Sequence, residues 1–190
     1  TPTSPLSEGA HALTVSATDP QGNESAKSPA VNLTVDTTAP SFTAGATKAV
    51  SVVENTTATI YTPAATDNVG IAKYALAGGA DDGLFNLNAG TGALSFKVAP
   101  NYEAPASAAG TNAYTVKLKA SDATGSSATQ TVTVNVTNVN EAPTAKGTVT
   151  AFSVGLGGAI NPLDVAAQFS DPDAGDALTY SLATGSSLPA

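Results

Sequence analysis

The sequence predicts an all-β protein built from tandem Greek-key sandwiches, one complete and two partial. A short pattern occurs twice: an alternating strand ends at Asp19 and again at Asp122, 103 positions later. Each time a polar turn and a second alternating strand follow, and an Ala-Pro pair ends 21 residues after the aspartate, at Pro40 and Pro143. A period of about one hundred residues with proline-containing connections is typical of arrays of β domains.

The repeat divides the chain into three units. Residues 1–39 are predicted to be the C-terminal part of one domain, residues 40–143 a complete domain, and residues 144–190 the N-terminal part of a third. Residues 36–40 are expected to be a linker, because proline cannot donate a hydrogen bond to a central strand and keeps its predecessor out of helical conformations.

Short runs bounded by Gly, Pro, Asn or Asp define the expected strands. In the complete unit these are residues 47–53, 57–62, 71–77, 84–87, 92–97, 113–120 and 129–137. The first unit has strands at 10–17 and 30–35, and the third at 149–154, 165–169 and 178–182. Seven strands in about one hundred residues is the pattern of a Greek-key sandwich, and no helix of consequence is expected.

The two strands near the end of the complete unit identify its core. Residues 113–120 place Tyr114, Val116 and Leu118 on one face and Thr and Lys on the other, and residues 129–137 alternate Val with Thr and Asn. Such period-two alternation indicates a sheet with one buried face. These valines are therefore predicted to be core residues and not the lining of a binding pocket.

Composition excludes several function classes. The chain has 7 Lys and no Arg against 15 acidic residues, with a formal net charge of -8 and a pI near 4.3. Nucleic acids and anionic membrane surfaces would be repelled. Cysteine is absent, which excludes a disulfide scaffold, and no apolar run approaches the 18 residues of a membrane span.

Catalysis is not expected from this sequence. His11 is the only histidine, so neither a histidine-rich zinc site nor a Ser-His-Asp triad is predicted. A glycosidase pair such as Glu54 and Glu103 would need a cleft with aromatic side chains, and the few Tyr and Phe fall mostly at core positions. Aspartates in turns fit two roles, which the residues alone leave open: hydrogen bonding within the turn or binding of a hard cation.

The residues between the strands resemble the cadherin-like repeats of large bacterial surface proteins. The likeness covers essentially all of residues 40–143. Its motifs are Val52-Val53-Glu54-Asn55, Ala65-Thr66-Asp67, the hairpin of residues 84–94, Asn101-Tyr102-Glu103, Ala120-Ser121-Asp122 and Asn138-Val139-Asn140-Glu141-Ala142-Pro143. Residues 8–40 look like the end of a bacterial immunoglobulin-like repeat. Residues 144–190 resemble the start of a cadherin-like or dystroglycan-type module through Phe169-Ser170-Asp171-Pro172-Asp173.

The resemblance implies Ca²⁺ at the domain junctions, held by both domain ends and the linker. At the second junction the implied ligands are Glu54, Glu103, Asn138, Asn140, Glu141, Asp171 and Asp173. At the first they are Asp36, Asp67 and Asp122. Ca²⁺ takes six to eight oxygens, more than any one short loop here supplies. The second junction, with more acids, is expected to be the better site, and affinities are expected at the weak end of about 10⁻⁴ to 10⁻³ M.

The function that this resemblance implies is structural and adhesive. The chain is expected to be a segment of a secreted or surface-anchored bacterial adhesin, stiffened by Ca²⁺ and extending a binding tip from the cell. Its expected partners are neighbouring repeats and cell-surface or matrix ligands. The alternative is a non-catalytic spacer or carbohydrate-contacting module of an extracellular polysaccharide-degrading enzyme.

Overall fold

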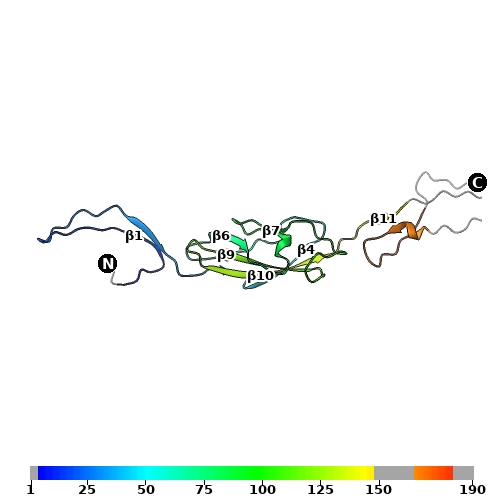
Figure 1. Ribbon diagram of the computed structural model, residues 1–190, viewed down its shortest axis with the longest axis horizontal. Coiled ribbons are helices and arrows are strands. Elements are labelled where there is room, and N and C mark those ends of the chain that lie inside the picture. The colour runs from blue at the N-terminus through cyan, green and yellow to red at the C-terminus, as the bar shows by residue number, and fades with distance from the viewer. Residues whose placement is uncertain (1–3, 148–164, 182–190) are drawn as a thin grey trace, which may run out of the picture.

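A computed structural model of the chain describes residues 4–147 and 165–181. Its strands form three groups in a row along the long axis (Figure 1). The first is the antiparallel hairpin of β1 (Gly9–Leu13) and β2 (Val31–Val35). The central sandwich follows, and then the antiparallel pair β11 (Thr144–Ala145) and β12 (Phe169–Ser170). The described residues are thus nearly all β, as predicted.

The central sandwich has two layers. One is a four-stranded sheet in the order β4 (Thr47–Val53), β10 (Ser127–Thr137), β9 (Ala113–Ser121) and β6 (Lys73–Leu76). Two smaller pairs provide the other layer: β3 (Ser41–Phe42) with β5 (Ala65–Thr66), and β7 (Phe85–Leu87) with β8 (Leu94–Phe96). The helical residues among those described are two 3₁₀ turns, η1 (Asp82–Leu84) and η2 (Ala166–Gln168). None of the described helices is long and apolar enough to cross a bilayer.

The core lies between these layers and includes the residues of β9 and β10 that alternation predicted. The inward side chains of β9 and β10, including Val116, Leu118, Val132 and Val134, have no exposed surface. The smaller pairs contribute aromatic rings: Phe85 and Phe96 stack at 4.5 Å between centroids, and Tyr114 meets Phe96 edge-on at 5.1 Å. Offset and edge-on contacts of this kind stabilise a core beyond the area that they bury.

A parallel pairing fixes which segments meet at each end of the sandwich. β4 runs parallel to β10, with Val53 opposite Thr137. The residues after both strands therefore emerge together at the end facing β11. β9 runs antiparallel to β10 and ends at Ser121, at the opposite end, where β3 and β5 also pair. Each end of the sandwich thus collects loops that are far apart in the sequence.

The expected strands differ from the observed ones mainly where pairing partners are lacking. Residues 57–62 form no strand, and only a single bridge joins Tyr61 to Leu94. In the expected strand at 165–169, η2 precedes the short β12, and residues 178–181 form no strand. The expected strand at 149–154 and residue 182 lie outside the described residues. The short strands β3 and β5 were not predicted.

Gly79 gives a direct test of the sandwich packing. A Cβ at Gly79 would lie 2.6 Å from the carbonyl oxygen of Thr115 and 2.7 Å from the Cα of Val116, and the residue has φ of +117°. Because backbone atoms cannot yield, we expect Gly79→Ala to lower the free energy of unfolding by about 2–3 kcal/mol. Gly78→Ala is the control: it has φ of +96° but open space around it, so only backbone strain applies. Equal urea midpoints for the two variants would contradict the close approach.

Candidate metal centres at the two ends of the sandwich

The first group of acids lies at the end of the sandwich that faces β2. Asp36, Asp67 and Asp122 each directly follow a strand, β2, β5 and β9 respectively. One carboxylate oxygen of each lies within 4.8 Å of those of the other two. Oxygens that bind one Ca²⁺ at 2.3–2.6 Å are no more than about 5 Å apart. The three aspartates, which we call the first cluster, therefore fit around a single ion.

Each aspartate of the first cluster uses its two oxygens differently. Oδ1 of Asp36 accepts a hydrogen bond from the backbone N–H of Thr38 at 3.3 Å, and Oδ1 of Asp67 accepts from Val69 at 2.9 Å. Oδ1 of Asp122 accepts from the N–H groups of three residues in its own turn, at 2.8 to 3.0 Å. Oδ2 of all three residues is buried and has no hydrogen-bond partner.

This division bears on the two roles, turn hydrogen bonding and cation binding, that the sequence left open. The turn hydrogen bonds use Oδ1 and leave Oδ2 of the same carboxylate without a partner, so a turn role does not exclude a ligand role. Asp19, which stands at the equivalent place in the first unit, shows that the division is not a general property of such turns. Its Oδ1 accepts from Gln21 and Asn23, and its Oδ2 also accepts, from the side chain of Asn23 at 2.8 Å.

Electrostatics shows that the first cluster suits a cation. Asp122 is only 4% exposed, and an unpaired buried carboxylate is costly. Burial tends to raise the pKa of Asp122, but the hydrogen bonds from its turn outweigh burial, so the pKa lies below its usual value. For Asp36, burial and the negative charge of Asp67 raise the pKa. A divalent cation would remove this repulsion.

The second cluster comprises Glu54, Glu103 and Glu141 at the opposite end of the sandwich. Their carboxylates also lie within 4.8 Å of one another. Because Glu54 follows β4 and β4 is parallel to β10, its side chain reaches the linker after β10: Oε1 accepts from the N–H of Val139 at 2.9 Å. Oε2 accepts from the N–H of Tyr102 at 2.7 Å. One buried carboxylate thus connects the linker to the loop that carries Glu103.

Glu103 and Glu141 keep oxygens available in this second cluster. Oε2 of each is buried without a hydrogen-bond partner. Oε1 of Glu141 accepts from the side chain of Asn55 at 2.6 Å, and Asn55 has the left-handed φ of 60°. Burial, together with the nearby carboxylates of Glu54 and Glu103, raises the pKa of Glu141 despite this hydrogen bond. The second cluster therefore also concentrates negative charge that a cation would neutralise.

A third group of acids approaches the second cluster from the turn after β12. Asp171, Asp173 and Asp176 lie within 4.8 Å of one another. Asp173 is buried, and its oxygens accept from the side chain of Asn138 and the N–H of Glu141, both at 2.7 Å. A cavity of about 360 Å³ joins the two groups, and it is lined by Tyr102, Glu103, Asn138, Asn140, Pro172, Asp173, Ala174 and Asp176.

All ten residues named as ligands from the sequence therefore lie at or beside the two ends of the sandwich. Three acids with other roles were missed. Glu8 lies beside the first cluster, where its carboxylate accepts from the side chain of Asn68 at 3.0 Å. Asp176 completes the third group. Asp81 is buried and accepts from the N–H groups of Ala108 and Thr115 at 2.6 and 2.7 Å.

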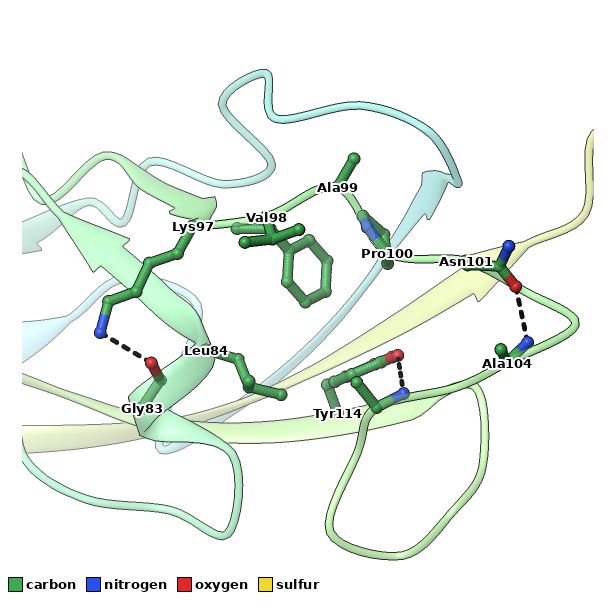
Figure 2. A pocket seen from close by; sticks show the side chains of 11 residues that line it. Gly83, Leu84, Lys97, Val98, Ala99, Pro100, Asn101, Ala104 and Tyr114 are labelled. Carbon is green, nitrogen blue, oxygen red and sulfur yellow. Dashed lines mark hydrogen bonds between the residues drawn. The ribbon is translucent and has the colours of Figure 1, made fainter.

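A separate apolar cavity of about 300 Å³ opens on the flank of the sandwich (Figure 2). The cavity is lined by Phe96, Tyr114 and Leu84, among others. In the view of Figure 2, residues 97–101 cross above Leu84 and Tyr114. The polar groups at its rim bond locally: the ammonium of Lys97 donates to the carbonyl of Gly83 at 2.7 Å, and the Tyr114 hydroxyl accepts from the N–H of Ala106 at 3.1 Å. The polar side chains among the described lining residues thus have partners in nearby backbone.

Comparisons with known proteins give a fold likeness. No family model and no curated protein matches the chain. Among solved structures it is similar to Drosophila N-cadherin extracellular domains 1–4, with 22% identity and a TM-score of 0.48, over 73% of this chain and 36% of that one. It is also similar to protocadherin gamma B7 extracellular cadherin domains 1–4, with 17% identity and a TM-score of 0.47, over 79% of this chain and 45% of that one. The chain spans less than half of the length of either structure.

Proposed function

We propose that this chain is a calcium-binding structural segment of an extracellular adhesive protein, in which cations at both ends of the central sandwich fix the direction of the neighbouring units. The observation that carries the proposal is the first cluster. Three aspartates from three separate segments each accept turn hydrogen bonds at Oδ1 and keep Oδ2 buried without a partner, and one carboxylate oxygen of each lies within 4.8 Å of those of the other two.

The donor set favours calcium over other metals. Both clusters offer only carboxylate, amide and backbone oxygens, which are the ligands of hard cations, and the chain has no cysteine for a soft metal. Asp36 belongs to the linker, whereas Asp67 and Asp122 belong to the sandwich, so one ion at the first cluster would tie the linker to the domain. At the other end, Glu141 in the linker and Glu54 and Glu103 in the sandwich would be tied in the same way.

This architecture supports a proposal for the wider setting of the chain. We assign the units as residues 1–39, 40–143 and 144–190, with the cation sites at the two boundaries. A row of small sandwiches with stiff junctions suits a protein that extends a binding region away from the cell, such as a surface adhesin of a bacterium. Neighbouring repeats are then the immediate partners, and the ligand of the whole adhesin would be contacted elsewhere.

Calcium removal tests the proposal. A ligand that binds only the folded state at 100 times its Kd stabilises that state by about 2.7 kcal/mol per site. For a domain of this size we expect chelation to lower the melting temperature by about 10 °C or more. Small-angle scattering should show a straighter particle with calcium than with chelator. Identical melting curves and scattering profiles in the two buffers would overturn the proposal, and magnesium at equal concentration is the control for a general salt effect.

A further inference from the structure

Glu8 occupies a special place at the first junction. It precedes β1, so it belongs to the N-terminal hairpin unit, yet its carboxylate contacts the linker and the sandwich. It accepts hydrogen bonds from the backbone N–H of Thr37, at 3.0 and 3.1 Å to its two oxygens, and from the hydroxyl of the same residue. It also accepts from the side chain of Asn68. Among the described residues, Glu8 to Asn68 is the hydrogen bond that joins residues 4–35 to residues 41–147.

The groups that Glu8 binds are the chain neighbours of two first-cluster aspartates. Thr37 follows Asp36, and Asn68 follows Asp67. Hydrogen bonding, first from the Thr37 hydroxyl, lowers the pKa of Glu8, although burial and the negative charge of Asp67 act in the other direction. Glu8 is therefore held as an anion beside three other carboxylates. Repulsion from these carboxylates weakens the contacts of Glu8 when no metal is bound, and a bound cation would strengthen them.

The three aspartates by themselves would not orient the preceding unit. Through Asp36 the ion would hold the linker, and through Asp67 and Asp122 it would hold the sandwich. The hairpin of β1 and β2 could still rotate about residues 35 and 36. The contact that removes this freedom is the bond from Asn68 to Glu8. Asn68 is in turn placed by Asp67, whose Oδ1 accepts hydrogen bonds from Val69 and Gly70 in the same turn.

We propose that Glu8 is the positioning residue through which a cation in the first cluster sets the direction of the preceding unit, without being needed for the ion to bind. This inference rests on the proposed function, since it presupposes an ion at the first junction. It assigns separate roles to the acids of one site. Asp36, Asp67 and Asp122 hold the cation, and Glu8 fixes the orientation of the hairpin unit when the cation is bound.

A distance measurement on the 190-residue chain separates these roles. The chain has no native cysteine, so spin labels can be placed at Asn32→Cys in β2 and Lys117→Cys in β9, both exposed. In the wild-type background we expect calcium to narrow the distribution of label distances. In Glu8→Gln we expect the affinity for calcium, measured by calorimetry, to change less than about threefold while the distribution stays broad. Glu24→Gln, an exposed acid of the same unit, is the matched control and should behave as wild type.

Asn68→Ala removes the other partner and should reproduce the broad distribution of Glu8→Gln with unchanged calcium affinity. A narrow distribution in calcium-loaded Glu8→Gln would overturn the role of Glu8 while leaving the calcium junction intact. A loss of affinity of more than tenfold in Glu8→Gln would also overturn it, because Glu8 would then be a ligand. A wild-type chain that binds no calcium would instead defeat the proposed function, and this inference with it.

Discussion

Replacing Asp36 by asparagine is expected to weaken calcium binding at the first cluster by at least about tenfold while leaving the metal-free protein as stable as the wild type, or more stable. The affinity falls because one of three anionic ligands becomes neutral. The metal-free stability does not fall because burial and Asp67 already disfavour the charged form of Asp36, whose pKa is raised. Its Oδ1 makes only one long hydrogen bond, to Thr38, which an amide oxygen can keep.

Amide chemical shifts can assign the binding to one cluster. The N–H of Gly125 donates to Asp122, and the N–H of Tyr102 donates to Glu54, so the two amides report on the first and second clusters separately. In a calcium titration of Asp36→Asn, the shift of Gly125 should need far more calcium, and that of Tyr102 should be unchanged. Asp82→Asn removes the same charge outside the clusters and should leave both titrations as in the wild type. Equal Gly125 titrations in wild type and Asp36→Asn would refute the assignment.

The raised pKa also predicts how this variant depends on pH. A carboxyl group whose pKa is higher in the folded state binds its proton more tightly there, so stability is lost as pH rises from the usual aspartate pKa, about 4, through the raised value. In the metal-free wild type, ionisation of Asp36 causes this loss of stability with rising pH. The variant Asp36→Asn does not lose stability in this way. The advantage of the variant in urea midpoint should therefore grow as pH rises through this window. With calcium bound the order should reverse, because the cation requires the charged form.

The sequence predicted strands of the four-stranded sheet well, both inside the sheet and at its edge, where residues 47–53 match β4. Residues 113–120 and 129–137 alternate strictly, and the structure extends them only to Ala113–Ser121 and Ser127–Thr137. The predicted strand at 57–62 is not one, because its backbone finds only Leu94 as a partner. The parallel pairing of β4 with β10 depends on a contact between distant segments. Local alternation contains no information about it, yet this pairing is what brings Glu54 to the linker.

The acids of the clusters were recognisable because each lies within a motif, as in Ala65-Thr66-Asp67 and Ala120-Ser121-Asp122. Asp176 had a local signal as well, since it is the third acid of the turn that contains Asp171 and Asp173. Glu8 had none: it lies in a short polar segment, and Asn68, its partner, is 60 residues away. The role of Asp81 was equally hidden, because the amides that it accepts from are 27 and 34 residues downstream.

Replacing Glu54 by alanine should lower the free energy of unfolding by about 3–5 kcal/mol, with and without calcium. The side chain is 2% exposed, and its two oxygens hold the N–H groups of Tyr102 and Val139. Removing the carboxylate leaves both part-buried N–H donors without their partner, at about 1–3 kcal/mol each, and adds a cavity. Glu54→Gln should cost about half as much, since one carbonyl oxygen remains to accept one of the two hydrogen bonds.

Glu103→Gln is the matched control for Glu54→Ala, because it changes an acid of the same cluster whose Oε2 has no hydrogen-bond partner. In Glu103→Gln, the chemical shift of the Tyr102 amide should need more calcium to change than in the wild type. The metal-free urea midpoint should stay close to that of the wild type. Hydrogen exchange adds a local readout: Glu54→Ala should accelerate exchange at Tyr102 and Val139 beyond the change in global stability, since the loop and the linker lose their common anchor. If both variants lowered metal-free stability equally, Glu54 would be one more cluster acid and not the residue that joins linker to loop.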